Sequence, residues 1–419
     1  MIKKIIPRLI FPFSFGLLLI FSVISTGFSQ APEKLKINFV DYFFENGSPL
    51  CWNLQGDTIL KISLFPDYER ESLNRQTTHW YFRVEADSGT HIRISISKML
   101  NEVYNGIPAT EWWDKVHPIT CYISYDQKNW QPVPTRLYQQ KELLFEFIMK
   151  ESDVYIARLP VYTISDLEDL KSGYSGDPNF TIIPVGATIE GRPLEIIRLG
   201  KQDAPHSVII RARAHPWEPG GNWIVEGLIN KFLSENSKKW KETFCVYIMP
   251  MANKDGVARG MTRFNVAGMD LNRKWDKMSD TDFCPEKYAL EKFIEGLIKH
   301  GIKPSLGIDI HNDDAGGINL ATHSKDDTLF IKRMQFFEKL MREKTTFSEK
   351  VQYSWDVPGE PEPFILFENG LYRRYGIEAM VYELNANWIS SRGRMPTQYD
   401  WMDIGANLNE VFYQFLLYP

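Results

Sequence analysis

Cysteine is scarce in this sequence, with four residues spread over 419 and no C-x-x-C pair. That spacing excludes a small domain held together by disulfides, and it excludes a zinc site built from thiolates. Basic runs are also absent, and the formal net charge is -5. Sequence-independent binding to a phosphate backbone therefore has little electrostatic support, and nucleic acid is not expected as a partner.

Low-complexity tracts and internal repeats are absent as well. Hydrophobic residues make up 43%, charged residues 24% and aromatic residues 14% of the chain. This mixture excludes a disordered, collagen-like, coiled-coil or multi-span membrane protein. A chain of this length has room for two or three domains and for a large buried core.

The one long apolar run lies near the N-terminus, at residues 9–24, and basic residues precede it. Gly27 and Ser29 then stand where a signal peptidase requires small residues, so residues 1–29 have the layout of a secretory signal peptide. The alternative is a membrane anchor, which the shortness of the run and its interruption by a proline and a glycine disfavour. We therefore expect an exported protein, periplasmic or secreted, without a stable membrane span after cleavage.

Between residues 36 and 158 the chain consists of short segments in which apolar and polar residues alternate, separated by turn residues. This pattern predicts an antiparallel β-sandwich domain over residues 30–160. The Gly- and Pro-containing stretch 161–178 is expected to form a short helical turn and a linker. Strands are expected at 80–85, 91–97, 120–125, 143–148 and 154–159.

Beyond residue 179 strand-like runs alternate with helical segments of about 10 to 15 residues. The alternation predicts an α/β/α domain over residues 179–419 with a mixed, mainly parallel sheet. In such sheets the functional residues lie beyond the carboxyl ends of the strands. Strands are expected at 207–214, 244–249, 305–310 and 379–383, and helices at 222–233, 285–299, 328–344 and 400–417.

Three histidines have an acid three residues downstream, a spacing too common in a chain with 53 acids to establish a metal site by itself. His215 and Glu218 follow an apolar strand and precede Gly220 and a helix, so their loop can turn both side chains toward one point. His311 also ends a strand and can supply a third ligand, whereas His323 is most simply a loop residue. His215, Glu218 and His311 are therefore predicted to bind Zn2+, with a fourth position left for water.

Glu383 ends another apolar strand, where an unpaired buried carboxylate would be costly. Close to the metal it can take a proton from bound water, whose pKa zinc lowers to about 7. The alternative is a salt bridge from Glu383 to Arg392 or Arg394.

Arginines follow in the same half of the chain: Arg273 comes directly after Asn272, and Arg263 lies ten residues earlier. A guanidinium group can bind a carboxylate through its planar fork or stabilise a developing oxyanion. A structural alternative is an ion pair between Arg273 and Asp270.

Several motifs surround these residues: Glu190-Gly-Arg-Pro-Leu, Ala212-Arg-Ala-His215-Pro-Trp-Glu218-Pro-Gly, Pro250-Met-Ala-Asn253-Lys-Asp-Gly256, Gly268-Met-Asp-Leu-Asn272-Arg273, Asp309-Ile-His311 and Tyr382-Glu383-Leu384. In order and spacing they resemble the zinc carboxypeptidases related to carboxypeptidase A, and most closely the cytosolic-carboxypeptidase-like branch, which trims C-terminal residues from proteins. The resemblance implies that residues 179–419 form the catalytic domain. It also implies that Arg263 polarises the scissile carbonyl and that Asn272 and Arg273 bind the terminal carboxylate. Glu383 would be the base and then the acid.

The same branch carries a β-sandwich before the catalytic domain, and the segments 79–83 and 155–167 resemble its markers. The sequence departs from the family in two places. No tyrosine stands clearly where relatives have an active-site tyrosine on a mobile loop, since Tyr353, Tyr372 and Tyr375 are only nearby. The later histidine is followed by Asn312-Asp313-Asp314, whose charge would either favour a basic substrate group or cap a turn.

The sequence thus predicts an exported zinc metallocarboxypeptidase that hydrolyses the C-terminal amide bond of a peptide or protein. Two alternatives stay open. One is a zinc amidase that trims cell-wall stem peptides, and the other is a catalytically silent protein that binds peptide or glycan. The sequence does not determine the preferred terminal residue, the role of the sandwich or the oligomeric state.

Overall fold

The computed structural model describes residues 36–57, 59–70, 74–103, 107–108, 119–139, 141–356 and 365–418. The predicted signal peptide, residues 1–29, lies outside this range. Within the described residues, every helix is too short or too polar to cross a membrane. The four cysteines all lie in the described part of the chain and are unpaired.

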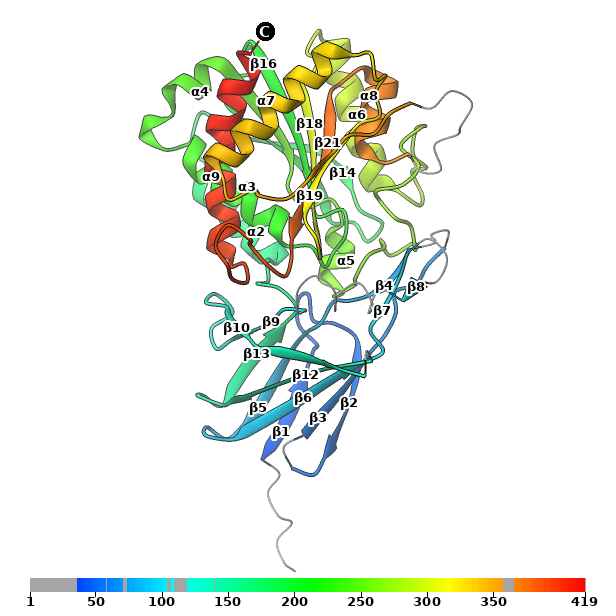
Figure 1. Cartoon of the computed structure of the whole chain (residues 1–419), viewed down its shortest axis with the longest axis vertical. Helices are drawn as coiled ribbons and strands as arrows, with labels where there is room; N and C mark the ends of the chain where they lie inside the picture. Colours follow the sequence, from blue (N-terminus) through cyan, green and yellow to red (C-terminus); the bar gives the residue numbers. More distant parts are fainter. Residues whose placement is uncertain are drawn as a thin grey trace, which may run out of the picture. The chain divides into compact units, whose positions relative to one another are not determined.

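Two packed sheets make up most of the described N-terminal half, as Figure 1 shows. Their strands are β1 (Ile37–Asp41), β2 (Leu50–Gln55), β3 (Ile59–Leu64), β5 (Tyr81–Ala86), β6 (His91–Ser97), β9 (Cys121–Ser124), β10 (Gln131–Val133), β11 (Thr135–Tyr138), β12 (Glu142–Ile148) and β13 (Asp153–Ala157). The order is β1-β5-β13-β9-β10 in one sheet and β11-β12-β6-β3-β2 in the other. The predicted antiparallel sandwich is confirmed, except that β3 and β6 pair in parallel. A small sheet is formed by β4 (Arg75–Thr77), β7 (Leu100–Val103) and β8 (Ile107–Pro108).

The core of the sandwich follows from the alternation seen in the sequence. In β6, Ile92, Ile94 and Ile96 are all buried and face the opposite sheet, where Phe82 and Val84 belong to the same apolar cluster. Successive side chains of a strand point to opposite faces, so one face of each sheet is apolar.

A mixed sheet organises the C-terminal half. Its strands are β14 (Phe180–Ala187), β15 (Pro193–Leu199), β16 (His206–Ala212), β17 (Phe244–Met249), β18 (Leu306–Asp313), β19 (Gly317–Leu320), β20 (Val351–Gln352) and β21 (Ala379–Asn385). Their order is β14-β15-β17-β16-β18-β21-β19-β20. The central strands β17, β16, β18 and β21 are mutually parallel, and β15 and β19 are antiparallel to their inner neighbours.

Helices cover both faces of this sheet (Figure 1). Helices α3 (Gly220–Phe232), α7 (Thr328–Lys344) and α9 (Gln398–Leu416) share one apolar core, and α6 (Pro285–Lys299) and α8 (Phe367–Tyr375) share the other. In β16, Ile210 belongs to the first core and Ile209 to the second, which is why this strand is apolar on both faces. Shorter helices are α4 (Lys238–Thr243) and α5 (Lys254–Ala258), and η1 (Glu235–Ser237) is a 3-10 turn.

A helix longer than the sequence predicted follows the sandwich. Helix α2 (Ile164–Tyr174) lies in the stretch expected to be a short helical turn and linker. Thr163 and Asp166 form a capping box at its start, because each side chain accepts a hydrogen bond from the other's backbone amide. Leu167 is buried in the core that also contains α3, and this burial stabilises a segment whose glycines indicated a linker.

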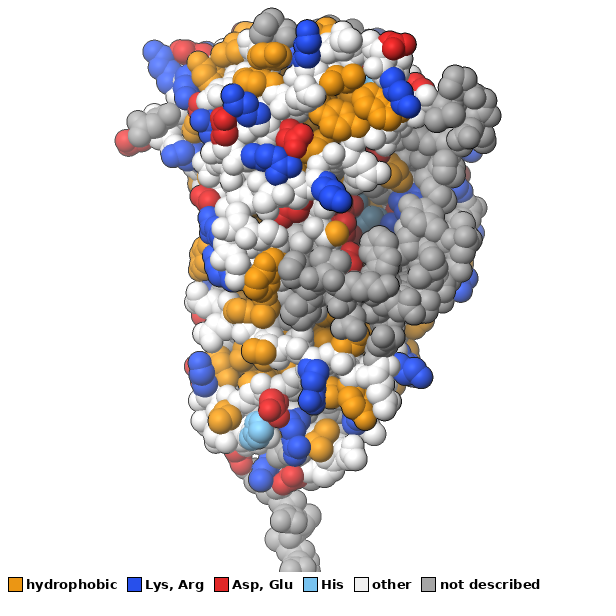
Figure 2. All heavy atoms as spheres, viewed as in Figure 1, with side chains coloured by type: hydrophobic (Ala, Val, Ile, Leu, Met, Phe, Trp, Pro, Cys, Tyr) orange, Lys and Arg blue, Asp and Glu red, His pale blue; other side chains and the backbone are white. Residues whose placement is uncertain are grey.

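Charged side chains of both signs are interspersed over the face of the molecule in Figure 2. This distribution agrees with a chain that has no basic run.

Candidate metal centre

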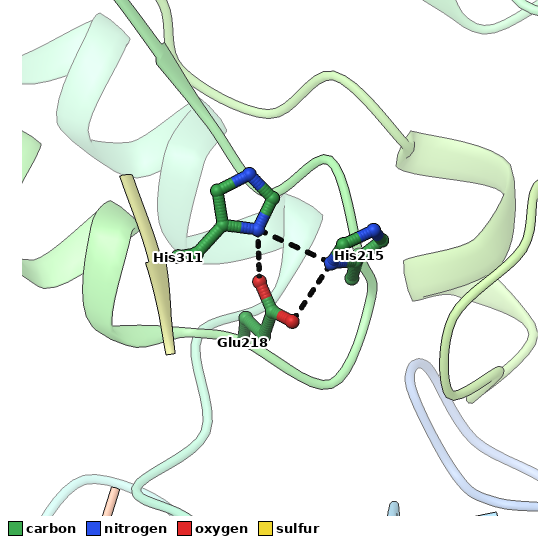
Figure 3. Close-up of side chains that lie close together, drawn as sticks. All are labelled: His215, Glu218 and His311. Carbon is green, nitrogen blue, oxygen red and sulfur yellow. Dashed lines mark hydrogen bonds and ion pairs between the residues drawn. The ribbon is translucent and has the colours of Figure 1, made fainter. Parts of the chain in front are cut away.

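The carboxyl ends of β16 and β18 place three side chains together (Figure 3). The two strands are parallel neighbours, with Ala212 opposite Ile310. His215 lies in the loop after β16, and His311 lies one residue beyond Ile310 at the same edge of the sheet. Glu218 lies between β16 and α3, where it points toward both histidines.

The three side chains are close enough to share one ion. The Nδ1 atom of His215 lies 2.8 Å from Oε1 of Glu218, and the Nδ1 atom of His311 lies 2.7 Å from Oε2. The two Nδ1 atoms are 3.1 Å apart. A tetrahedral zinc ion separates its ligand atoms by roughly 3.3 Å, so small shifts of these side chains would admit it. The residues therefore fit a zinc ion.

Each histidine has a carboxylate behind it. The Nε2 atom of His215 lies 3.1 Å from Oδ1 of Asp270, and the Nε2 atom of His311 lies 2.6 Å from Oδ2 of Asp309. Such a carboxylate fixes the tautomer and orientation of a metal-binding imidazole. Nδ1 is thereby left as the nitrogen that faces Glu218.

Asp309 is itself held by a buried arginine. The Nε atom of Arg211 donates to Oδ1 of Asp309 at 2.7 Å, and a second guanidinium nitrogen contacts Oδ2. Arg211 also donates to the carbonyl oxygen of Leu271 and packs over the ring of Trp275. This arginine therefore joins the strand edge to the segment before Asn272.

Local backbone features shape the loop that carries His215 and Glu218. Arg213 adopts a φ of 59°, and its guanidinium donates to the carbonyl oxygen of Pro216 and to Asn222 Oδ1. Gly220 donates its amide to Asn312, and a Cβ atom at Gly220 would lie 2.7 Å from Asn312 Oδ1. A larger residue would have to displace the side chains of Asn312 and Leu384, so glycine lets the start of α3 lie against β18.

The electrostatics of the cluster favour a cation. Burial of Glu218 opposes its ionisation, but the charges of His215 and His311 outweigh burial and lower its pKa to about 2. Burial also opposes protonation of His311, yet Asp309 and Glu218 raise its pKa well above the usual value. A site that holds an imidazolium ion in this way also attracts a metal cation.

Glu383 is the next acidic side chain along this edge. It is paired with His311 in the register of β18 and β21, so their Cα atoms lie about 4.8 Å apart on neighbouring strands. Its Oε2 atom is buried and has no hydrogen-bond partner among the described residues. Burial raises its pKa well above the usual value; nearby Asp313 and Glu218 raise it further, and His311 lowers it. The salt bridges considered for Glu383 do not form, because Arg392 and Arg394 contact Asp400.

The predicted substrate-binding residues lie beside Asp270. Arg263 donates from Nε to Oδ2 of Asp270 at 2.9 Å, and Arg273 lies 3.8 Å from the same oxygen. The ion pair between Arg273 and Asp270 that was considered from the sequence is therefore present. Asn272 Oδ1 accepts from Arg211 and from the amide of Phe367.

A cavity of about 550 Å3 opens next to these residues. Its lining includes Asp270, Arg273 and three lysines, Lys274, Lys277 and Lys287. Lys287 donates to the carbonyl oxygens of Arg273 and Lys274. Asp280 also lines the cavity, so its lining has four cations and two acids.

Other residues noted in the sequence lie outside the cluster. His323 stacks on Phe330 and Tyr372, and the hydroxyl of Tyr375 contacts Glu295. Asp313 accepts from the amides of residues 315 and 316, so it caps a turn.

The sequence did not reveal the roles of Asp270 and Asp309, the carboxylates behind the histidines, although both lie within the motifs that resemble the family. Asp309 stands two residues before His311 on one strand, and this spacing puts both side chains on the same face. That period-two relation was a usable signal for Asp309. Asp270 had no comparable signal, because it reaches His215 from 55 positions away.

Two buried histidines and a carboxylate, with an unpaired glutamate beside them at the carboxyl edge of a mixed sheet, define a metal-dependent hydrolase site. The comparisons with known proteins are specific. A family model described as zinc carboxypeptidase matches residues 167–322, and one described as the cytosolic carboxypeptidase N-terminal domain matches residues 40–159. The chain belongs to the zinc carboxypeptidase family, whose members are zinc-dependent hydrolases.

Individual relatives are similar to different shares of the chain. An uncharacterized protein of Zymomonas mobilis is 24% identical over 73% of this chain and 78% of its own length. Cytosolic carboxypeptidase 3 of Bos taurus is 29% identical over 45% of this chain, but the match spans only 19% of that longer protein. A metallo-carboxypeptidase structure from Burkholderia cenocepacia shares the fold, with a TM-score of 0.74 and 21% identity over 90% of this chain and 98% of the other.

Proposed function

We propose that the protein is an exported zinc metallocarboxypeptidase that hydrolyses the C-terminal amide bond of peptides or proteins. The observation that carries the proposal is the convergence of His215, Glu218 and His311 beside Glu383. The proposal includes a division of the chain into a signal peptide (1–29), a sandwich (30–160), a linker (161–178) and a catalytic domain (179–419).

His215, Glu218 and His311 would hold the metal. A bound zinc ion supplies a Lewis acid that polarises a carbonyl oxygen and lowers the pKa of water to about 7. Glu383 takes a proton from the attacking water and then gives it to the leaving amine. Burial raises the pKa of Glu383 above its usual value, which makes it a stronger base for the first of these steps.

Arginine side chains explain why cleavage would be terminal. Asn272 and Arg273 bind the free carboxylate of the last residue, which an internal residue lacks. Arg263 stabilises the negative charge that develops on the carbonyl oxygen. Its pairing with Asp270 fixes the guanidinium before the substrate binds.

The cavity beside Arg273 favours an acidic terminal side chain. Its lining carries four cations against the two acids Asp270 and Asp280, so a carboxylate there would meet a net positive charge. The turn at Asp313 supports no preference for a basic residue, because that carboxylate accepts backbone amides instead.

A peptide library that differs only in its last residue tests the activity. We expect the zinc-loaded protein to release single C-terminal residues, acidic ones fastest, and to leave the same peptides intact when their C-termini are amidated. Mass spectrometry identifies the products. Release from muropeptides but not from ordinary peptides would instead support the cell-wall amidase. A protein without stoichiometric zinc and without any release would support the silent binding protein.

Export rests on the charge and apolar pattern of residues 1–29. The relatives with an assigned name are called cytosolic, so the location needs its own test. Cell fractionation and N-terminal sequencing of the mature protein should find a chain that begins near residue 30 outside the cytoplasm. A cytoplasmic protein with its first residues intact would contradict export and leave the activity unaffected.

A further inference from the structure

A carboxylate of the sandwich reaches into the catalytic half. Asp67 lies between β3 and β4, and its side chain accepts the backbone amides of three successive residues, Thr262, Arg263 and Phe264. The distances are 3.0 Å, 2.6 Å and 3.1 Å, in that order. Successive amides that converge on one point form an anion-binding nest, and here Asp67 is the anion.

Hydrogen bonds from other segments hold the carbonyl side of the loop that receives Asp67: the amide of Trp217 donates to the carbonyl oxygen of Thr262, and the side chain of Asn253 donates to that of Phe264. Residues 259–284 contain turns and bends but no helix or strand. Thr262, Arg263 and Phe264 are all buried, so their amides would lose their water without gaining a partner if Asp67 were absent. Asp67 is therefore the partner that holds the amide side of residues 262–264.

The side chain of Arg263 continues this contact toward the metal ligands. Two of its guanidinium nitrogens lie 2.9 Å and 2.8 Å from Oδ2 of Asp270. The other oxygen of Asp270 lies 3.1 Å from Nε2 of His215. A continuous series of hydrogen bonds thus leads from Asp67 through Arg263 and Asp270 to His215.

We propose that Asp67 is a positioning residue, through which the sandwich fixes Arg263 for the reaction and, through Asp270, the orientation of His215. The inference rests on the proposed function, since it gives the sandwich a part in carbonyl polarisation. Asp67 itself touches neither the substrate nor the metal.

Other hydrogen bonds also hold the sandwich against the catalytic half. A positioning role of Asp67 can therefore be distinguished from simple docking of the two halves. Arg70 donates to the carbonyl oxygens of Gly268 and Ala267, and Tyr122 donates to the carbonyl oxygen of Pro396 at 2.6 Å. These bonds keep the sandwich in contact with the catalytic half when Asp67 is changed. Tyr122→Phe is a matched control, because it removes a bond between the same two halves at a distance from the Arg263 loop.

The test compares Asp67→Asn and Asp67→Ala with Tyr122→Phe and the unchanged protein. At pH 8 we expect Asp67→Ala to lower kcat roughly 10- to 100-fold with little change in KM, because Arg263 acts on charge that develops after binding. Asp67→Asn keeps one acceptor oxygen, so its kcat should lie between that of Asp67→Ala and that of the unchanged protein. Zinc affinity, measured by competition with a chromophoric chelator, should fall in the same order. Tyr122→Phe should change neither quantity.

Amide hydrogen exchange gives a readout that needs no activity. In the metal-free protein, the amides of 262–264 should exchange at least about tenfold faster in Asp67→Ala than in the unchanged chain, because they lose bonds to a charged acceptor. The positioning role would be overturned if the amides of 262–264 exchanged equally fast in Asp67→Ala and in the unchanged protein. Equal losses of kcat in Asp67→Ala and Tyr122→Phe would also overturn it. If the unchanged protein cleaves nothing, the proposed function fails, while exchange and zinc affinity still decide whether Asp67 orders the loop.

Discussion

Residues with opposite charge alternate through the metal centre, from Arg211 to Asp309, His311 and Glu218. Each buried charge therefore has a partner, which removes most of the cost of burying it. Glu383 is the exception, since one of its oxygens is buried without a partner among the described residues. A buried carboxylate oxygen without a partner is unfavourable for stability, and this is the reason for proposing Glu383 as the group that transfers the proton.

Glu383→Gln should lower kcat by about 10²- to 10⁴-fold while KM changes little, because the amide cannot carry the proton. Steady-state kinetics with a released peptide product measure both constants. Zinc content should stay near one ion per chain, and Glu378→Gln, one residue before β21 and away from the cluster, should keep full activity. Unchanged turnover in Glu383→Gln would show that another group is the base.

Asp309→Asn should lower zinc affinity roughly 10- to 100-fold, because the amide holds the imidazole of His311 less firmly and withdraws a negative charge. Chelator competition gives the affinity. The loss of the pair with Arg211 also destabilises the fold, so thermal unfolding of the metal-free variant must be measured alongside. Unchanged affinity would mean that Asp309 serves only to pair with Arg211.

At the scale of elements, α3 and α9 lie in direct backbone contact on one face of the sheet. A Cβ atom at Gly405 of α9 would lie 2.0 Å from the carbonyl oxygen of Ile224, and one at Gly227 of α3 would lie 2.0 Å from that of Met402. Two glycines thus let the helices approach closely. Helix α3 begins at the loop with the metal ligands, so this packing also fixes the loop.

Gly405→Ala should destabilise the protein by roughly 3 kcal/mol, since the added methyl group forces the helix backbones apart. Urea unfolding gives the free energy. The matched control is Gly296→Ala in α6, where a Cβ atom meets nothing within 4 Å. There alanine should stabilise the helix by about 0.5 to 1 kcal/mol. Equal effects at the two positions would contradict the close approach of α3 and α9.

At the scale of the whole molecule, the sandwich contacts both flanks of the metal centre. Asp67 holds the Arg263 loop on one flank. On the other, Arg158 donates to Asn387, just beyond the strand that carries Glu383, at 2.7 Å. His79 of the sandwich is buried near Arg213 in the loop with the metal ligands, and burial together with that charge lowers its pKa to about 3. The sandwich is thus part of the support of the site.

This histidine predicts a loss of stability in acid. The unfolded chain binds its proton near pH 6.5, whereas folded His79 binds it only near pH 3, so stability falls as pH drops through this window. Between pH 7 and pH 4.5 the loss from this group is roughly 3 kcal/mol. Thermal or urea unfolding of metal-free protein should show a steeper decline for the unchanged chain than for His79→Gln. An equal loss of stability with falling pH in the unchanged chain and in His79→Gln would show that His79 is hydrated in the folded state.

Elements with strong periodicity could be predicted from the sequence alone. The bounds of α6, α7, β6 and β17 agree with those predicted, because the first three each bury one apolar face in a core and β17 is apolar on both faces. The short edge strand β20 and its neighbour β19 were missed. Their sequences carry little periodicity, and pairing with neighbouring strands defines them.

The sequence by itself predicted the donor set: His215 and Glu218 follow one apolar strand, His311 lies near the end of another, and strand ends in a parallel sheet meet at one edge. Only the tertiary structure decided which ring nitrogens face inward, which carboxylates lie behind them, and that Asp67 reaches a loop 196 positions away. Hydrogen bonds between such distant segments depend on how the domains pack. Local sequence pattern contains no record of that packing.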